Sequence, residues 1–128
     1  MALQPGLART ERFVVGERML TDLRGSLLVP VLSTPAMIAM MERNASLLAQ
    51  EQLASGEASV GFAMCVKHVA GAREGAACSV SAELREVIDG RKLRFDVEVR
   101  EGGRTIGLGT HERRVIDVAR HAASTGQG

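Results

Sequence analysis

Apolar and polar residues follow strand-like patterns through the second half of the chain. Large apolar residues fall on even positions from Val60 to Val69, and the two following segments alternate apolar and polar residues strictly. Strict alternation is typical of antiparallel strands with one face in water. Asp89-Gly90 between two of these segments is a hairpin signal. We therefore predict a meander of four long antiparallel strands. They cover residues 60–69, 78–84, 93–99 and 105–118.

A run that is apolar on every side precedes these strands. Residues 36–41 (AMIAMM) offer no polar face, and a helix that is apolar all round is a buried helix. Thr34 and Pro35 suggest its start, because a hydroxyl caps a helix well and proline suits the first turn. We predict a helix from Pro35 to about Leu53, whose second half turns amphipathic with Asn44 among its polar residues.

The order of these elements favours one architecture. An extended segment over residues 9–20 and an irregular stretch over residues 21–33 precede the helix, and residues 1–8 and 119–128 are predicted to be loose ends. A helix without a polar face has to be wrapped by a sheet. We therefore predict a single α+β domain of the hot-dog type over residues 1–128, in which a curved antiparallel sheet wraps a long central helix. Because one sheet covers only part of a helix, we expect a homodimer with sheets paired edge to edge.

Composition narrows the class of protein. A net charge of +1 over 128 residues gives no reason to expect nucleic acid or a charged membrane as partner. Three Phe without Trp or Tyr provide no stacking platform for bases. No stretch approaches the roughly 20 apolar residues of a membrane span. Two cysteines are too few for a disulfide framework, and no secretory leader is visible, so we expect a soluble, cytoplasmic protein.

Three polar residues stand in apolar surroundings. Thr34 opens the helix, Glu42 is the first charge eight residues on, and His68 ends the apolar face of the first long strand. Polar groups in such places cost free energy unless they are partnered. A hydroxyl, a carboxylate and an imidazole are the parts of a hydrolytic site. Each residue alone also has a structural explanation. Thr34 would cap the helix, Glu42 would mark the point where the helix emerges into water, and His68 would be a structural histidine with its hydrogen bonds satisfied.

Other residues could support such a site. Gly61 lies on the same strand as the histidine and would let a ligand approach the backbone closely. Arg113 lies on the same face of its predicted strand as Gly107, Gly109 and His111. For an arginine, however, a surface ion pair is the default explanation. The histidines and cysteines have no recognised metal-ligand spacing, so we expect no metal. Neither a nucleophile elbow nor a phosphate-binding glycine loop is present.

Taken together, the chain resembles the fluoroacetyl-CoA thioesterase family of hot-dog proteins over most of its length after about residue 30. The stretches that carry the resemblance are TPAMIAMME from Thr34, VGFAMCVKHVA from Val60, SAELR from Ser81 and GLGTHERRVI from Gly107. The resemblance implies a homodimeric hydrolase for an acyl-CoA thioester. It also implies no metal and no cofactor beyond the CoA of the substrate.

The resemblance also implies roles for individual residues. Thr34, Glu42 and His68 correspond to the catalytic residues of the family, Gly61 to a glycine near the acyl group, and Arg113 to an arginine linked with recognition of the acyl group. The residues leave open whether the reaction passes through an acyl-enzyme or through direct attack by water. They also leave open whether the acyl group arrives on CoA or on a carrier protein.

One segment departs from the family. The fluoroacetyl-specific member guards its acyl pocket with phenylalanines in the segment before the catalytic threonine, whereas this chain has GSLLVPVLS there. We expect Leu28 to contact the substrate instead, which favours a small or medium acyl group other than fluoroacetyl. The alternative function is a non-catalytic hot-dog module that binds an acyl thioester. Nothing specific supports a hot-dog dehydratase.

Overall fold

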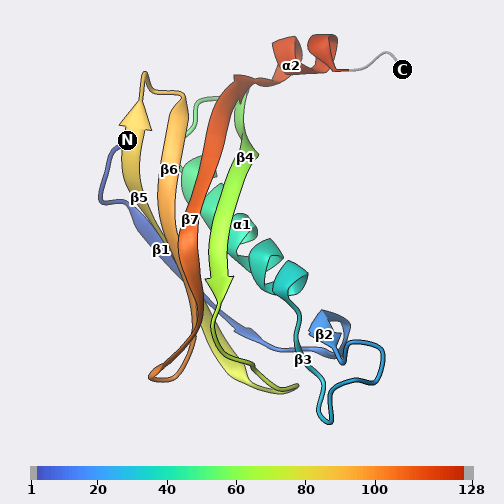
Figure 1. The fold of residues 1–128 in the computed structure, drawn as a ribbon. Coiled ribbons are helices and arrows are strands. Elements are labelled where there is room, and N and C mark those ends of the chain that lie inside the picture. Colours follow the sequence, from blue (N-terminus) through green and yellow to red (C-terminus); the bar gives the residue numbers. More distant parts are fainter. Residues whose placement is uncertain (1–2, 126–128) are drawn as a thin grey trace.

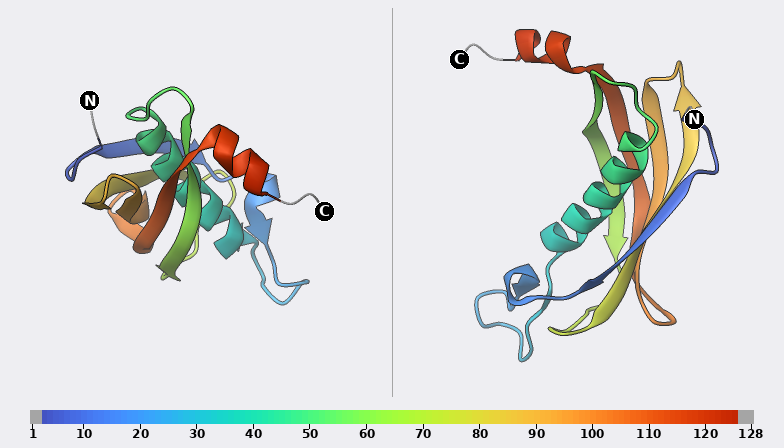
Figure 2. Two further views of the ribbon diagram at one scale, coloured as in Figure 1. Left: turned by 90° about the horizontal axis from the view of Figure 1, so that it is seen from above. Right: turned by 180° about the vertical axis from the view of Figure 1, so that it is seen from behind.

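A five-stranded antiparallel sheet curves around one long helix (Figure 1). The computed structural model describes residues 3–125. Helix α1 (Thr34–Gln50) lies on the concave side of the sheet (Figure 2), so the predicted central helix and curved antiparallel sheet are confirmed. The sheet has the order β1-β5-β6-β7-β4. Its strands are β1 (Ala8–Val14), β4 (Glu57–His68), β5 (Ala77–Ile88), β6 (Lys92–Glu101) and β7 (Arg104–Asp117).

The strand order corrects the predicted meander. Strands β5, β6 and β7 do follow one another, but β4 pairs with β7 rather than with β5, and β5 pairs with β1. Residues 69–76 make this crossing possible, since eight residues reach about 26 Å and three strand spacings amount to about 14 Å. The tight turns after β5 and β6 allow no such crossing. Strand β4 therefore forms an edge of the sheet in the single chain.

The chain ends are more ordered than expected within the described residues. Gly6 N donates to Leu84 O and Leu84 N donates to Leu7 O, both at 2.8 Å, so these residues extend the pairing of β1. Helix α2 (Val118–Ser124) follows β7 and is capped by Asp117. The prediction of loose ends is therefore wrong for residues 6–8 and 119–124, while residues 1–2 and 126–128 lie outside the described part. Between β1 and α1 lie a short 3₁₀ helix, η1 (Glu17–Met19), and a small ribbon of β2 (Leu20–Thr21) and β3 (Val31–Leu32).

A β-bulge in β4 changes which residues face the helix. The register shifts after Gly61, and Phe62 has no partner on β7. One extra residue exchanges the sides of the sheet that the following even- and odd-numbered residues face. Gly61 pairs with Arg113 on the side of α1, whereas Phe62 is 62% exposed under the guanidinium of Arg114, which lies 3.6 Å from the ring centroid. The predicted common face of this strand is therefore wrong at Val60 and Phe62.

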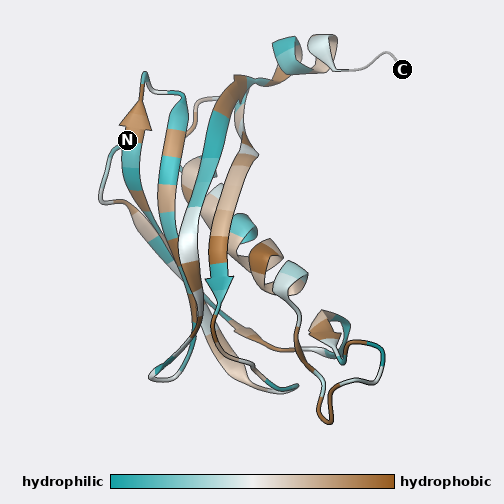
Figure 3. Cartoon of the chain, viewed as in Figure 1, coloured by the Kyte–Doolittle hydropathy of each residue, from teal (hydrophilic) through white to brown (hydrophobic). Residues whose placement is uncertain are grey.

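The core lies between α1 and the middle strands. Apolar and polar residues alternate along β5 and β6 as predicted, and the colours of these strands alternate accordingly in Figure 3. Their apolar side chains pack against one face of α1. The buried residues of this layer are Met37, Met41, Ala45, Leu48, Ala49, Val80, Ala82, Leu84, Leu93, Phe95, Val97 and Val99.

One buried residue of α1 is polar. Asn44 was expected on a solvated face, but it is fully buried. Its Nδ2 donates to Arg9 O at 2.7 Å and to Val80 O at 3.3 Å, and its Oδ1 accepts from Nη1 of Arg9. These bonds satisfy the amide in place of water, and they tie α1 to strands β1 and β5.

Replacing Asn44 with alanine should therefore destabilise the fold. The change removes the hydrogen bonds that Nδ2 donates to the part-buried Arg9 carbonyl and the buried Val80 carbonyl, which typically costs about 1–3 kcal/mol. Gln50→Ala is the matched control, because Gln50 lies exposed on the same helix, and its effect should stay within about 0.5 kcal/mol. Urea unfolding measures both free energies. Equal effects of the two variants would contradict a structural role of the Asn44 amide.

Candidate active site

Thr34 lies in the first turn of α1, but the residue that caps the helix is Ser33. Ser33 Oγ accepts from Ala36 N at 3.2 Å, so the prediction of Thr34 as the cap is wrong. Serine caps a helix at least as well as threonine, and either hydroxyl could have served. Because Ser33 takes this role, the Thr34 hydroxyl is free to bond elsewhere.

The Thr34 hydroxyl meets the imidazole of His68, as a hydrolytic site requires. Thr34 Oγ1 and His68 Nδ1 are 2.7 Å apart. Thr34 stands at the start of α1 and His68 at the end of β4, so the contact joins two elements 34 residues apart in sequence. An imidazole in contact with a hydroxyl can take its proton and make the oxygen a nucleophile.

The second nitrogen of His68 is buried without a partner. Within residues 3–125, no group bonds to His68 Nε2. A buried polar atom without a hydrogen bond costs free energy in the folded state. The atom therefore marks a place where another group, from a substrate, a water molecule or a second chain, would be stabilised.

The helix N-terminus offers fewer free donors than an average helix end. Pro35 has no N–H, and the N–H of Ala36 is donated to Ser33 Oγ. Met37 N donates to Ser33 O at 3.0 Å, which is the first ordinary bond of the helix. Among the first three residues of α1, this leaves the Thr34 N–H as the donor that could face a developing oxyanion.

Glu42 lies about two turns further along α1 and belongs to a second polar cluster. Its Oε2 is 3.5 Å from Nη1 of Arg113. A Cβ at Gly61 would overlap this same oxygen, so the missing side chain leaves room for the carboxylate. The Glu42 side chain is 50% exposed, whereas that of Arg113 is 6% exposed. The carboxylate thus lies at the boundary between the buried cation and solvent.

Arg113 is held by the neighbouring strand. Its Nε donates to Ser59 Oγ at 2.7 Å and its Nη2 donates to Ser59 O at 2.9 Å. Burial lowers the pKa of Arg113, and the carboxylate of Glu42 acts in the opposite direction. A guanidinium keeps its charge in proteins. The default explanation of Arg113 as a surface ion pair is therefore wrong, because this arginine is a buried cation.

His111 lies in the same cluster as Arg113, although no motif in the sequence indicated a role for it. Its side chain is 2% exposed, its Nδ1 lies 2.8 Å from Ala63 O, and its Nε2 lies 3.2 Å from Nη1 of Arg113. Its ring stacks on Phe95 with the centroids 6.1 Å apart. Burial lowers the pKa of His111. His111 and Arg113 occupy alternate positions of the same strand and therefore share a face. This pattern was the signal that could have identified His111.

A small cavity of about 230 Å³ opens beside this second cluster. Its lining combines apolar side chains with Glu42 and His111. The lining residues are Ile38, Glu42, Gly61, Phe62, Ala63, Met64 and His111. Leu28, which we expected to contact the substrate, is fully exposed in the single chain and does not line this cavity.

The expected trio therefore divides into two parts. Thr34 and His68 are in contact at the start of α1, and Glu42 contacts Arg113 about two turns away. In the described part of the chain, neither a hydrogen bond nor an ion pair links Glu42 to Thr34 or to His68. The single chain thus brings together two of the three predicted catalytic residues.

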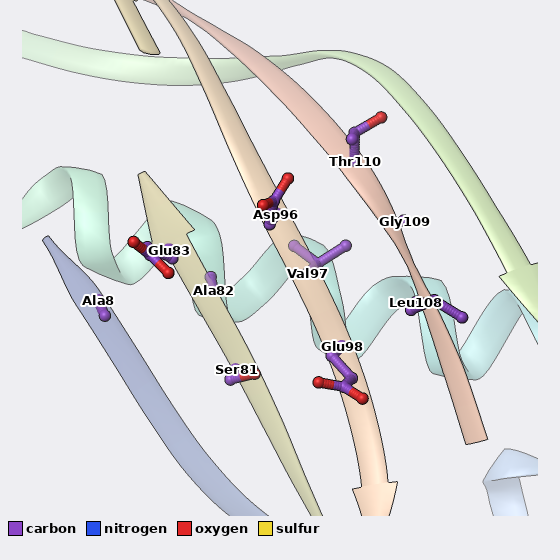
Figure 4. A pocket seen from close by; sticks show the side chains of 10 residues that line it. All are labelled: Ala8, Ser81, Ala82, Glu83, Asp96, Val97, Glu98, Leu108, Gly109 and Thr110. Atoms are coloured by element: carbon purple, nitrogen blue, oxygen red, sulfur yellow. The ribbon is translucent and has the colours of Figure 1, made fainter. Parts of the chain in front are cut away.

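A larger groove crosses the opposite side of the sheet. It measures about 540 Å³, and its carboxylates alternate along β5 and β6 with Ala82 and Val97, whose side chains belong to the core (Figure 4). The carboxylates in it are Glu83, Asp96 and Glu98, and these pair with Arg85 or Arg100. The groove has no nucleophile in contact with a base. The better candidates for chemistry therefore lie on the side of α1, at the Thr34–His68 contact and at the smaller cavity beside Glu42.

No group of three or more His, Cys, Asp or Glu side chains among residues 3–125 is arranged to hold a metal ion. No helix in the same range is long and apolar enough to cross a membrane.

Comparisons with known proteins give two sequence matches. The family of fluoroacetyl-CoA-specific thioesterases matches residues 9–119. A fluoroacetyl-CoA thioesterase from Streptantibioticus cattleyicolor is 39% identical over 97 residues, which are 76% of this chain and 69% of that protein.

Solved structures show the same fold. The fluoroacetyl-CoA thioesterase FlK superposes with a TM-score of 0.86 at 32% identity, covering 96% of this chain and 95% of that one. A mutant of FlK in complex with fluoroacetate and CoA gives a TM-score of 0.83 at 33% identity, over 93% of this chain and 99% of that one. A hot-dog-like protein from Thermanaerovibrio acidaminovorans shares the fold, with a TM-score of 0.83 at 21% identity over 97% and 94% of the two chains. The predicted hot-dog fold is thus confirmed, and the chain belongs to the fluoroacetyl-CoA-specific thioesterase family of thioester hydrolases.

Proposed function

We propose that this protein hydrolyses an acyl-CoA with a small or medium acyl group. The 2.7 Å contact between Thr34 and His68 is the observation that carries the proposal, since it provides a hydroxyl beside a base. The complex of the FlK mutant with fluoroacetate and CoA supports CoA as the handle. The segment before Thr34 contains Leu and Val in place of Phe, which supports an acyl group other than fluoroacetyl.

The proposed reaction adds water across the thioester bond. His68 takes a proton from the Thr34 hydroxyl or from water, and the resulting oxygen attacks the carbonyl carbon. The Thr34 N–H stabilises the oxyanion together with the backbone of Gly61 from the other subunit of a homodimer, at about 3 kcal/mol for one such donor. The C–S bond then breaks, and the leaving sulfur receives the proton. Glu42 either orients His68 or attacks the carbonyl itself. When Thr34 or Glu42 is the nucleophile, water then hydrolyses the resulting acyl-enzyme, so every route releases a free acid and CoA.

The proposed active unit is a homodimer paired along β4. This strand is an edge of the sheet, and an exposed edge is a template for pairing with another chain. On α1, Ala39 is exposed while Ile38 and Met40 are only half-buried, so a second copy would complete the burial of this apolar turn. Fully exposed Leu28 precedes the same helix and would gain a neighbour as well.

Dimerisation would also join the two parts of the site. Antiparallel pairing of two β4 strands about a dyad near Met64 and Cys65 brings the partner's His68 opposite Gly61, and hence beside Glu42. Among residues 3–125, the buried Nε2 of His68 has no hydrogen-bond partner, and a carboxylate from the other subunit would supply one. The two cysteines are free, which supports the proposed location in the reducing cytoplasm.

Removing either charged member of the proposed trio should abolish turnover. Glu42→Gln and His68→Ala should each lower kcat by about 100-fold or more, because each removes a group that moves a proton or attacks. Glu86→Gln, an exposed carboxylate on β5, is the control and should retain activity. The measurement is thiol release from a panel of acyl-CoAs and carrier-protein thioesters. Measurable binding without release from any of them would support the alternative, a non-catalytic binding module.

Adding one methyl group at Gly61 should displace the Glu42 carboxylate. A Cβ at this position overlaps Glu42 Oε2, and a half-exposed side chain can swing aside at little cost in stability. We expect Gly61→Ala to keep its free energy of unfolding within about 1 kcal/mol while kcat/KM falls by about 10- to 100-fold. Gly103→Ala is the control, since no neighbouring atom of the described residues lies within 4 Å of a Cβ there. Equal activity of the two variants would rule out a role for this close approach.

Mixing two inactive variants tests whether the subunits share a site. In a mixed dimer of Glu42→Gln and His68→Ala chains, one of two shared sites keeps both residues intact. Random reassociation should then restore about a quarter of wild-type activity. If each site were built within one chain, the mixture would remain as inactive as its components. Sedimentation of the mixture checks that dimers have formed.

A further inference from the structure

His111 is a buried titratable group that the proposed mechanism leaves unused. A carbonyl oxygen can only accept a hydrogen bond, so the 2.8 Å contact with Ala63 O places a proton on Nδ1 of His111. In the neutral ring, Nε2 then carries a lone pair. Nη1 of Arg113 is a donor and lies 3.2 Å from this nitrogen. His111 therefore accepts a hydrogen bond from Arg113.

The surroundings keep this ring neutral. Burial lowers the pKa of His111, and the charge of Arg113 lowers it further. The bond to Ala63 and the carboxylates of Glu42 on α1 and Glu112 on β7 act in the opposite direction, but the net shift is downward. At neutral pH the lone pair on Nε2 is therefore available to Arg113.

His111 and Ser59 together fix both edges of the Arg113 guanidinium. Ser59 on β4 holds Nε and Nη2 at 2.7 and 2.9 Å. The remaining nitrogen, Nη1, has Nε2 of His111 at 3.2 Å and Oε2 of Glu42 at 3.5 Å. Glu42 is half-exposed and its contact is the longer one, so His111 is the better anchor for Nη1. The imidazole itself is held by Ala63 O and by stacking on Phe95.

We propose that His111 is a positioning residue for the acyl end of the site. Its Nε2 holds Nη1 of Arg113 beside Glu42, and Arg113 in turn fixes this carboxylate at the cavity near Gly61 in which a bound acyl group would lie. This inference rests on the proposed function for its effect on catalysis. Its structural part, the bond from Arg113 to a neutral imidazole, stands without turnover.

Two substitutions separate the two nitrogens of His111. In His111→Gln, the side-chain oxygen reaches the place of Nε2 and can still accept from Arg113. In His111→Asn, the side-chain amide reaches the place of Nδ1 and can still donate to Ala63 O, but it is too short to reach Arg113. Both variants lose the stacking on Phe95. Their free energies of unfolding should therefore fall by similar amounts, which urea titration checks.

The two variants should differ in activity. We expect His111→Gln to keep kcat/KM within about 5-fold of wild type and His111→Asn to lose about 30- to 100-fold, since a displaced positioning group can cost about 100-fold. Because His111 acts through Arg113, adding His111→Asn to Arg113→Lys should cause little further loss. Equal losses in the Gln and Asn variants, or losses that multiply with Arg113→Lys, would overturn the proposal.

A spectroscopic measurement keeps this inference separate from the proposed function. The ¹⁵N shifts of His111 should show a protonated Nδ1 and an unprotonated Nε2 at neutral pH. Rotation of the Arg113 guanidinium, followed by NMR exchange, should be slow in wild type and His111→Gln but faster in His111→Asn. The opposite tautomer, or equal rotation rates in all three proteins, would refute the positioning role whether or not thiol is released. Absence of thiol release with these signatures intact would refute only the proposed function.

Discussion

The packing of α1 against the concave side of the sheet is the constraint on which the candidate site depends. Met37 and Met41 are fully buried in this layer, and the Met37 sulfur occupies the space that a Cβ at Gly107 would need. This close approach holds the helix at a fixed depth over the sheet. Its first turn consequently meets the end of β4, and its third turn meets the bulge near Gly61. A single layer of apolar contacts thus fixes the positions of both polar parts of the site.

Burial of the Arg113 charge shapes the second of these parts. A buried cation is costly unless its donors are satisfied, and here a serine, a neutral imidazole and a carboxylate satisfy them. Glycine at position 61 provides the space for this carboxylate. The result is a cation held by hydrogen bonds directly behind Glu42 and His111, two of the residues that line the small cavity.

Local patterns predicted some elements well and others poorly. The alternation along β5 and β6 reports burial directly, because the sheet is covered on one side only. The bulge at Phe62 escaped prediction, since one unpaired residue reverses the parity without leaving a local signal. Ser33 and Thr34 are neighbouring hydroxyls of similar capping strength, so the pattern could not choose between them. Asn44 looked solvated because its partners on β1 and β5 are remote in sequence.

By itself, the sequence determined the type and order of the main elements, the family and the set of polar residues worth considering. Periodicity and motif spacing are local, and they record which face of an element a residue occupies. Only the tertiary structure decided which of these residues meet. It placed Thr34 against His68, separated both from Glu42, and added His111 beside Arg113. These distances depend on strand order, on the bulge and on the position of the helix over the sheet, which arise from many weak packing contacts between segments far apart in the chain.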